Sequence, residues 1–297
     1  MKVYYSPDYV GAAYAFETTR KAKWVADSLL TSPLTGVRLA EPTPLTEEQI
    51  ASVHDRTYVE AVKTGVPRYL AQSQGFTWDP GLWSMVLSSN GGAVSACLDA
   101  LESGLAGSLS SGLHHARGDS GAGFCTFNGL VIAAREALSA GAGSVLILDL
   151  DAHCGGGTAS LIAGDPRIWQ ADVAVNAFDY YQAAPGDAAR VAFAFVERAG
   201  GYLAAIGNVL EEMAARHGHF DLCLYNAGMD PYEGCDTGGL MGITRETLAQ
   251  RERMVFAWCR QHCSATAFVL AGGYIGWGLD IAGLVDLHRL TLAAAAS

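Results

Sequence analysis

The side chains most able to do chemistry stand at alternate positions of one short segment. Asp149, Asp151 and His153 follow an apolar run that begins at Val145, and glycines occupy positions 155–157. Because successive side chains of a strand point to opposite faces, residues two apart project from the same face. Two carboxylates and an imidazole would then meet at one point, where they could hold a metal ion. The alternative is a strand end with hydrated acids, but a buried carboxylate pair requires a cation or a proton.

Two adjacent histidines form a second candidate group. His114 and His115 lie on a glycine-flanked loop after a predicted strand over 106–111. Neighbouring side chains point in different directions, so at least one of the two rings faces a cleft. Imidazoles with different neighbours can differ in pKa, and the pair could therefore supply both a base and an acid near neutral pH. Two polar loop residues without a catalytic role are the alternative.

A third carboxylate follows a different predicted strand. Asp230 comes just after the apolar segment 222–226, beside Gly228, where the backbone can approach a ligand closely. A turn acid or a helix N-cap is the alternative interpretation. Together with Asp151 and His153, Asp230 would supply three nitrogen or oxygen ligands and leave one coordination position open, as a hydrolytic zinc ion requires.

An aromatic hydroxyl follows yet another predicted strand. Tyr274 comes directly after Gly272 and Gly273, where the apolar run ends. Its hydroxyl could polarise a carbonyl group or stabilise the oxyanion that forms from it. A turn tyrosine that serves packing alone is the alternative. The segment would thus add a second electrophile to a metal ion and a histidine pair.

Short apolar segments that alternate with longer periodic ones would position these groups. Strand followed by helix, repeated along the chain, predicts an α/β fold with a mainly parallel sheet covered on both faces. In such sheets ligands bind at the carboxyl ends of the strands, where the candidate groups fall. The predicted strands are 3–5, 106–111, 144–150, 173–178, 222–226 and 266–270. The predicted helices are 18–30, 46–52, 82–102, 127–140, 188–216, 245–261 and 281–295.

Composition limits the classes of function. The 297 residues are 50% hydrophobic with no linker, which predicts one domain over 1–297. A formal net charge of −11 with only 19 Lys and Arg argues against direct nucleic-acid binding and suits a cationic substrate. We find no signal peptide, no membrane-spanning run and no paired Cys-x-x-Cys motif, so we expect a cytoplasmic protein with free thiols and no membrane partner. Cys259 and Cys263 are interpreted as core residues.

Five motifs, in this order, resemble the histone deacetylase superfamily, whose arginase/deacetylase fold is shared with acetylpolyamine amidohydrolases and acetoin-utilisation proteins. The motifs are His114-His115-Ala116, Gly123 to Asn128, Asp149 to His153, Ala227 to Asp230 and Gly272-Gly273-Tyr274, with weaker similarity at 53–59 and 91–93. The resemblance covers nearly the whole chain. It implies a single-domain, three-layer fold and an amide hydrolase that acts on an acylated amine, such as acyl-lysine or a small acylated amine.

The resemblance also implies the metal sites. Asp151, His153 and Asp230 match the ligands of one zinc ion per chain. Asp149 matches a carboxylate that holds the first histidine of the tandem pair from behind. In related proteins this carboxylate also helps to bind a structural potassium ion, so Asp149 and the Asp151 backbone are the candidate potassium site.

Catalytic and substrate-binding roles are implied in the same way. His115 matches the base that deprotonates the attacking water, and His114 is its neighbour in the tandem pair. Tyr274 matches the tyrosine that hydrogen-bonds the substrate carbonyl alongside zinc. Gly123 and Phe124 match the loop that lines a narrow acyl-lysine tunnel. The residues expected to contact substrate are Gly123, Phe124, Gly272 and Gly273.

The chain departs from the family pattern beside the expected metal ligands. The family has a second histidine after the ligand histidine, and an Asp or Asn two residues further, where this chain has Cys154 and Gly156. The missing group normally orients the general base, so we expect water or an unrelated side chain to replace it, or catalysis to be weak. In the segment 179–187, Tyr180 and Tyr181 are the candidates for a second aromatic at the tunnel entrance.

Three hypotheses follow. The first is a zinc-dependent deacylase, and the second is a metal- or acyl-lysine-binding protein with weak or lost catalysis. The third, a binuclear manganese ureohydrolase, ranks last because Gly155 stands where a second metal would need a carboxylate. The short segment 67–79 weakens the case for a polyamine substrate. The acyl group and the amine stay open, and a homo-oligomer is compatible with the sequence.

Overall fold

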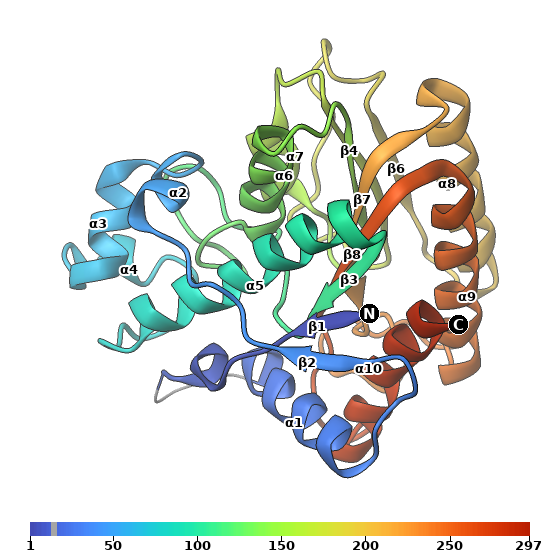
Figure 1. Ribbon diagram of the computed structural model, residues 1–297, viewed down its shortest axis with the longest axis horizontal. Helices are drawn as coiled ribbons and strands as arrows, with labels where there is room; N and C mark the ends of the chain where they lie inside the picture. The colour runs from blue at the N-terminus through green and yellow to red at the C-terminus, as the bar shows by residue number, and fades with distance from the viewer. Residues whose placement is uncertain (13–16) are drawn as a thin grey trace.

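A parallel β-sheet forms the centre of the protein (Figure 1). The computed structural model describes residues 1–12 and 17–297, and over these residues the sheet has eight strands in the order β2-β1-β3-β8-β7-β4-β5-β6. The strands are β1 (Lys2–Tyr4), β2 (Arg38–Ala40), β3 (Leu105–Ser108), β4 (Val145–Asp149), β5 (Ile168–Ala174), β6 (Val191–Phe195), β7 (Phe220–Gly228) and β8 (Cys263–Ala271). Every neighbouring pair is parallel, which confirms the predicted fold class.

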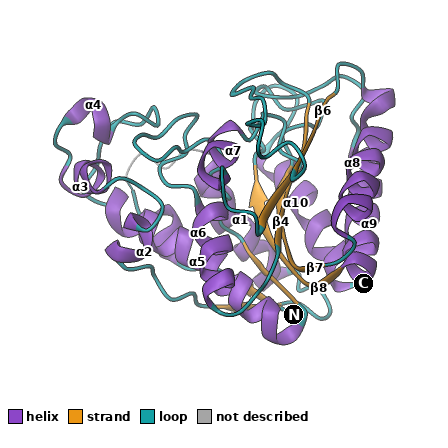
Figure 2. Ribbon diagram, turned by 90° about the horizontal axis from the view of Figure 1, so that it is seen from above, coloured by secondary structure: helices purple, strands orange, loops and turns teal. Residues whose placement is uncertain are grey.

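Helices cover both faces of this sheet (Figure 2). The α-helices are α1 (Glu17–Thr31), α2 (Glu47–Ala51), α3 (Arg56–Thr64), α4 (Arg68–Ala71), α5 (Leu82–Ser103), α6 (Gly129–Ser139), α7 (Gly156–Ile162), α8 (Tyr202–His217), α9 (Arg245–His262) and α10 (Ile281–Ala296). The 3₁₀ helices are η1 (Pro7–Val10) and η2 (Ala199–Gly201). One buried hydrophobic cluster includes residues of α1, α8, α9 and α10, and the other includes residues of α2, α3, α5 and α6.

The side chains of β4 show why two clusters form. Leu146 and Leu148 belong to the first cluster, whereas Val145 and Ile147 belong to the second. Alternate residues of a strand point to opposite faces, and all four of these side chains are fully buried. Complete burial of each contributes about 1.5–3 kcal/mol. An apolar strand of this kind therefore requires helices on both of its faces, which gives the three layers.

The two strands that the sequence did not reveal lie at the edges of the sheet. β2 spans only three residues, and β6 falls inside the segment 188–216 that we predicted as one helix. That prediction is wrong, because β6 pairs with β5 and α8 begins only at Tyr202. An edge strand has a partner on one side only and is partly exposed, so its hydrophobic pattern resembles the first turns of an amphipathic helix.

The strand β5 begins earlier than predicted. It spans Ile168–Ala174, whereas the sequence predicted a strand over 173–178. Gln170 and Asp172 interrupt its apolar pattern, yet both side chains are completely buried. Polar groups inside a buried strand need partners, and the partners of Asp172 belong to the site described below. The helices α3, α4 and α7 were not predicted; α7 begins in the glycine run, where helix propensity is low.

The sheet order brings the candidate residues to one edge. The four neighbouring strands β3, β8, β7 and β4 end beside one another near the centre of Figure 1. The loops that follow them carry the histidine pair, Tyr274, Asp230 and the Asp151–His153 segment, respectively. Along the described parts of the chain, every helix is too short or too polar to cross a lipid bilayer.

Candidate active site

Asp151, His153 and Asp230 meet at the carboxyl ends of β4 and β7. One potential ligand atom of each lies within 4.8 Å of those of the other two, and all three residues are buried. His153 Nδ1 is 3.0 Å from Asp151 Oδ1 and 3.1 Å from Asp230 Oδ2. Asp230 lies 77 or more positions after Asp151 and His153 in the chain. The direct pairing of β4 with β7 brings it beside them.

The donor chemistry of this group fits a divalent cation. Asp230 Oδ1 accepts a hydrogen bond from the Ala152 N–H at 3.0 Å, whereas the buried Oδ2 makes no well-oriented hydrogen bond, although His153 Nδ1 lies 3.1 Å away. Burial and the neighbouring Asp151 carboxylate raise the pKa of Asp230 to about 6. Burial also acts against ionisation of Asp151, but His114 and His153 together hold its pKa below the usual range. Two buried carboxylates and an imidazole fit a divalent cation held by three protein ligands.

His114 is held by a buried carboxylate. Its Nδ1 lies 2.7 Å from Asp149 Oδ2, and the side-chain amide of Asn226 donates to Asp149 Oδ1 at 2.8 Å. Burial lowers the pKa of His114, but the Asp149 and Asp151 carboxylates outweigh it and raise the pKa to about 10. His114 is therefore an imidazolium at neutral pH.

His115 is the neutral member of the pair. Burial and the positive charge of His114 lower the pKa of His115 to about 4. Its Nδ1 lies 3.0 Å from Asp179 Oδ2, a residue that the sequence did not single out. Asp179 belongs to the loop after β5, whose register cannot be read from one sequence because it has no regular periodicity. The environment therefore favours a positively charged His114 beside a neutral His115, with ring centroids 3.9 Å apart.

Aromatic rings line the approach to these groups. An open cleft is lined by His115, His153, Phe124, Phe178 and Tyr274, among others. The Phe178 ring lies edge-on to His115, with centroids 4.9 Å apart, and 6.1 Å from His153. Phe178 is therefore a second aromatic ring in the lining of this cleft, beside Phe124.

The predicted candidates for that second aromatic, Tyr180 and Tyr181, are wrong. Their rings pack instead on Phe193 of the edge strand β6, at centroid distances of 5.5 and 5.3 Å. The missed strand explains the error, because β6 supplies the surface on which both tyrosines rest.

A model of the histone deacetylase domain matches residues 15–280 of the chain. The chain belongs to the histone deacetylase family. It is 34% identical over 247 residues to an uncharacterized protein of Picosynechococcus sp., an alignment that spans 82% of this chain and 80% of that protein. It is 27% identical over 260 residues to Histone deacetylase 2 of Arabidopsis thaliana, spanning 80% of this chain and 63% of that protein.

A solved structure with the same fold is the acetylpolyamine aminohydrolase of Burkholderia pseudomallei. It superimposes with a TM-score of 0.79 at 18% sequence identity, covering 100% of this chain and 99% of that one. The resemblance to histone deacetylases and acetylpolyamine amidohydrolases is thereby confirmed, and members of this family are deacetylases and amidohydrolases.

Glycines let this deacetylase-family site close around its ligating groups. Gly123 has φ +49°, and a Cβ there would lie 2.5 Å from His115 Cδ2 and 2.8 Å from Phe178 Cε1. Gly272 has φ +50°, and a Cβ there would collide with the carboxylate of Asp230. Gly273, with φ +95°, packs against Leu284. Gly123 and Gly272 thus lie where the backbone approaches the site closely, whereas Gly273 approaches the hydrophobic core; no side chain fits at any of the three.

Backbone strain is concentrated at the same place. Within residues 1–12 and 17–297, the non-glycine residues with positive φ are Leu113 (60°), Phe124 (66°) and Asp179 (58°). All three border the histidine pair or the cleft. Such a conformation costs about 1–3 kcal/mol and persists only where the surroundings impose it. The surrounding structure therefore holds the backbone of the site in one conformation, as a preorganised site requires.

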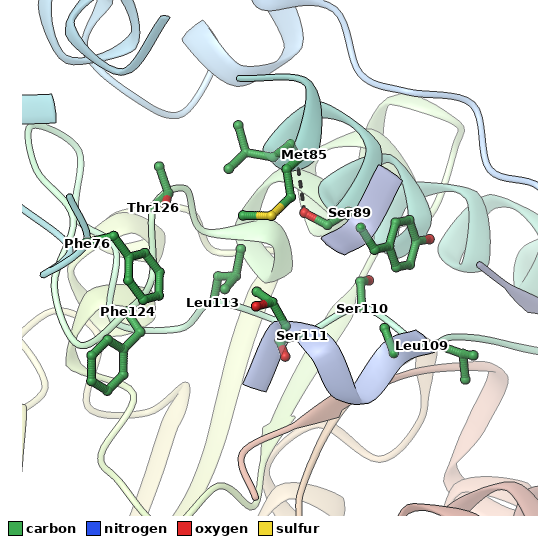
Figure 3. A pocket seen from close by; sticks show the side chains of 13 residues that line it. Phe76, Met85, Ser89, Leu109, Ser110, Ser111, Leu113, Phe124 and Thr126 are labelled. Carbon is green, nitrogen blue, oxygen red and sulfur yellow. Dashed lines mark hydrogen bonds between the residues drawn. The ribbon is translucent and has the colours of Figure 1, made fainter. Parts of the chain in front are cut away.

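A second, more enclosed pocket lies beside the site (Figure 3). Phe124, Leu113 and Ser111 line it and also line the space next to the histidine pair and Asp151. The rest of its wall is mostly apolar, with contributions from Phe76 and Met85, which Figure 3 shows facing the same space. Phe124 thus lines both this pocket and the open cleft.

A second group of ligand-type side chains lies elsewhere, near the amino-terminal ends of the strands. Cys223 of β7, Cys259 of α9 and Cys263 of β8 have sulfur atoms within 4.8 Å of one another. All three are buried within the first hydrophobic cluster. Cys259 and Cys263 are therefore core residues, as the sequence indicated.

Proposed function

We propose that the protein is a zinc-dependent amidohydrolase that removes an acetyl or other acyl group from an acylated amine, either acyl-lysine or a small acylated amine. The observation that carries this proposal is the juxtaposition of Asp151, His153 and Asp230 with a neutral histidine and an aromatic-lined cleft. An amide carbonyl that enters the cleft would meet a Lewis acid, a base and a hydroxyl donor at one point.

Asp151, His153 and Asp230 would hold one zinc ion per chain. When bound, zinc polarises a carbonyl group and lowers the pKa of a coordinated water toward about 7. His115, neutral because of its burial, would accept the proton of the attacking water. His114, held as an imidazolium by Asp149, would supply positive charge beside the oxyanion.

Tyr274 lines the cleft together with His153, their ring centroids 6.4 Å apart. We assign its hydroxyl the hydrogen bond to the developing oxyanion. A histidine must then return a proton to the departing amine, because otherwise the tetrahedral intermediate would collapse back to the amide. Aromatic rings at Phe124 and Phe178 suit an alkyl chain that leads to the amide.

A structural potassium ion would lie beside Asp149, as the resemblance implies. Asp149 of β4 pairs in register with Asp172 of β5. Asp172 Oδ2 accepts a hydrogen bond from the Gly155 N–H at 2.8 Å, but its Oδ1 is buried without a donor. Burial and the Asp149 carboxylate raise the pKa of Asp172. Two adjacent buried carboxylates fit a hard cation with oxygen ligands, and Asp172 is a ligand that the sequence did not suggest.

The alternative function, a binding protein with weak or lost catalysis, was motivated by the missing carboxylate at Gly156. Asp179 now supplies a carboxylate to His115, so the hydrolase is the better-supported proposal. The ureohydrolase would need a second metal with its own carboxylate at position 155, which is a glycine. Asp172 and Asp149 lie nearby, but both belong to the proposed potassium site.

The test combines metal analysis with a panel of acyl-lysine and acylpolyamine reporters on the same sample. We expect about one zinc per chain, release of acetate or another acid, and loss of both after His153→Ala. His219→Ala serves as the matched control, because His219 is an exposed histidine that bonds Ser264 at 3.0 Å and lies outside the site. Bound zinc without turnover on any acylated amine would favour the binding protein instead.

A further inference from the structure

We propose that Asp179 orients the general base His115, in place of the carboxylate or carboxamide that the family carries at the position of Gly156. This inference rests on the proposed function and deepens it. Asp179 contacts His115 and is not among the residues that line the cleft, so it is a positioning residue.

The contact geometry of Asp179 is that of a base-orienting carboxylate. Its Oδ2 lies 3.0 Å from His115 Nδ1 and also accepts the Gly157 N–H at 3.0 Å. Its Oδ1 pairs with the guanidinium of Arg117. The side chain of Asp179 is 8% exposed. A buried carboxylate with all of these partners is fixed in position and remains ionised.

The tautomer of His115 follows from this contact. A carboxylate accepts hydrogen bonds and does not donate, so the proton of neutral His115 must sit on Nδ1. Nε2 is then left with its lone pair free to accept a proton. This is the arrangement that a general base needs. On the neighbouring ring, Asp149 makes the same kind of contact with Nδ1 of His114.

Gly156 and Asp179 depend on each other. A Cβ at position 156 would lie 2.6 Å from Asp179 Oδ1 and 2.8 Å from its Cγ, and closer still to its carbonyl oxygen. The space behind His115 can therefore hold the side chain of residue 156 or that of Asp179, but not both. Glycine at position 156 removes the carboxylate or carboxamide that the family carries there, and it also makes room for the side chain of Asp179.

The backbone conformation of the loop also supports the contact of Asp179 with His115. Asp179 adopts φ 58°, a region that non-glycine residues enter at a cost of about 1–3 kcal/mol. Arg117 bonds to both residues: its Nη1 donates to the Gly156 carbonyl at 3.4 Å, and its Nη2 pairs with the carboxylate of Asp179. The backbone N–H of Cys154 donates to the Phe178 carbonyl at 3.0 Å, which ties the loop to the metal-ligand segment.

The decisive variant is Asp179→Asn, because asparagine keeps the side-chain shape and tolerates a left-handed backbone. On an acetyl-lysine reporter we expect kcat to fall about 10–100-fold, which is the usual effect of removing a partner of this kind. KM and zinc content should stay within about twofold of the unaltered protein. The acidic limb of the kcat/KM profile should move to lower pH, because His115 loses an anionic partner.

The matched control is Asp187→Asn. Asp187 lies in the same loop, is 9% exposed and pairs with Arg190, but it does not contact His115. If Asp179 only stabilised the loop, the two variants would have similar kcat values, and the pH profile of kcat/KM would not move. Equal kcat and an unchanged profile for Asp179→Asn would overturn the inference.

A measurement without turnover separates this inference from the proposed function. Imidazole ¹⁵N NMR of the zinc-loaded protein should show His115 protonated on Nδ1, and Asp179→Ala should redistribute the proton between Nδ1 and Nε2. The failure of all acylated amines as substrates would refute the hydrolase, while the NMR result would still test Asp179. A His115 tautomer that is the same in both proteins would refute the role of Asp179.

Discussion

Gly156→Ala should lower the activity of the protein by displacing Asp179. Gly156 begins α7, and its φ lies outside the left-handed region, so alanine can adopt the same conformation. Helix propensity favours alanine over glycine by up to about 1 kcal/mol, so propensity does not oppose the substitution. The effect on activity must then come from the added methyl group.

The size of the effect follows from the contacts of that methyl group. A Cβ at 156 would lie 2.6 Å from Asp179 Oδ1, whereas ordinary contacts begin at 3.4 Å, so the carboxylate must move by about 0.8 Å. The Asp179 carbonyl is closer still, so rotation of the side chain alone cannot relieve the clash. Misplacement by about 1 Å costs up to about 10²-fold in rate. We expect kcat to fall between tenfold and a hundredfold.

The assay compares kcat on an acylated amine with the free energy of unfolding in urea, for Gly156→Ala and for Gly186→Ala. Gly186 is the control because an added Cβ there meets nothing within 4 Å. The double variant with Asp179→Asn should be no slower than Asp179→Asn alone, since both changes break one contact. Additive losses in the double variant, or full activity in Gly156→Ala, would refute the reasoning.

Two further predictions concern Tyr274 and His54. Tyr274→Phe should lower kcat by about 10²–10³ with zinc content unchanged, as measured by steady-state kinetics and metal analysis, and a larger effect on KM than on kcat would contradict the assigned role. Burial lowers the pKa of His54 to about 4, and its Nε2 accepts the Asn128 N–H at 2.9 Å. Because the unfolded chain binds this proton near pH 6.5, stability should be full above that pH and fall by roughly 3 kcal/mol as the pH drops toward 4. Urea unfolding at pH 7 and pH 5 should show a smaller difference for His54→Asn, and equal differences would exclude His54 as the cause.

Much of the site could be predicted because its residues follow the ends of strands. An apolar run such as Val145–Asp149 marks a buried strand, and the polar residues directly after it must lie at the carboxyl edge of the sheet. Alternation within Asp149 to His153 then places three side chains on one side. The fold class, the family and the four groups around the cleft therefore follow from local patterns in the sequence.

Tertiary structure decided what depends on contacts between distant loops. Nothing local in the segment around Asp179 shows that it reaches His115, 64 positions away in the chain, because the loop has no periodicity and its path is set by β5 and α7. In the sequence, Asp172 only interrupts an apolar run. The pairing of β5 with β4 places it beside Asp149. The sequence did not reveal the edge strand β6, because only one side of this strand is paired. For that reason it also did not reveal that Tyr180 and Tyr181 pack on Phe193. The sequence by itself identified the candidate ligating residues and the order in which strands present them; the contact of Asp179 with His115 depends on the folded loops alone.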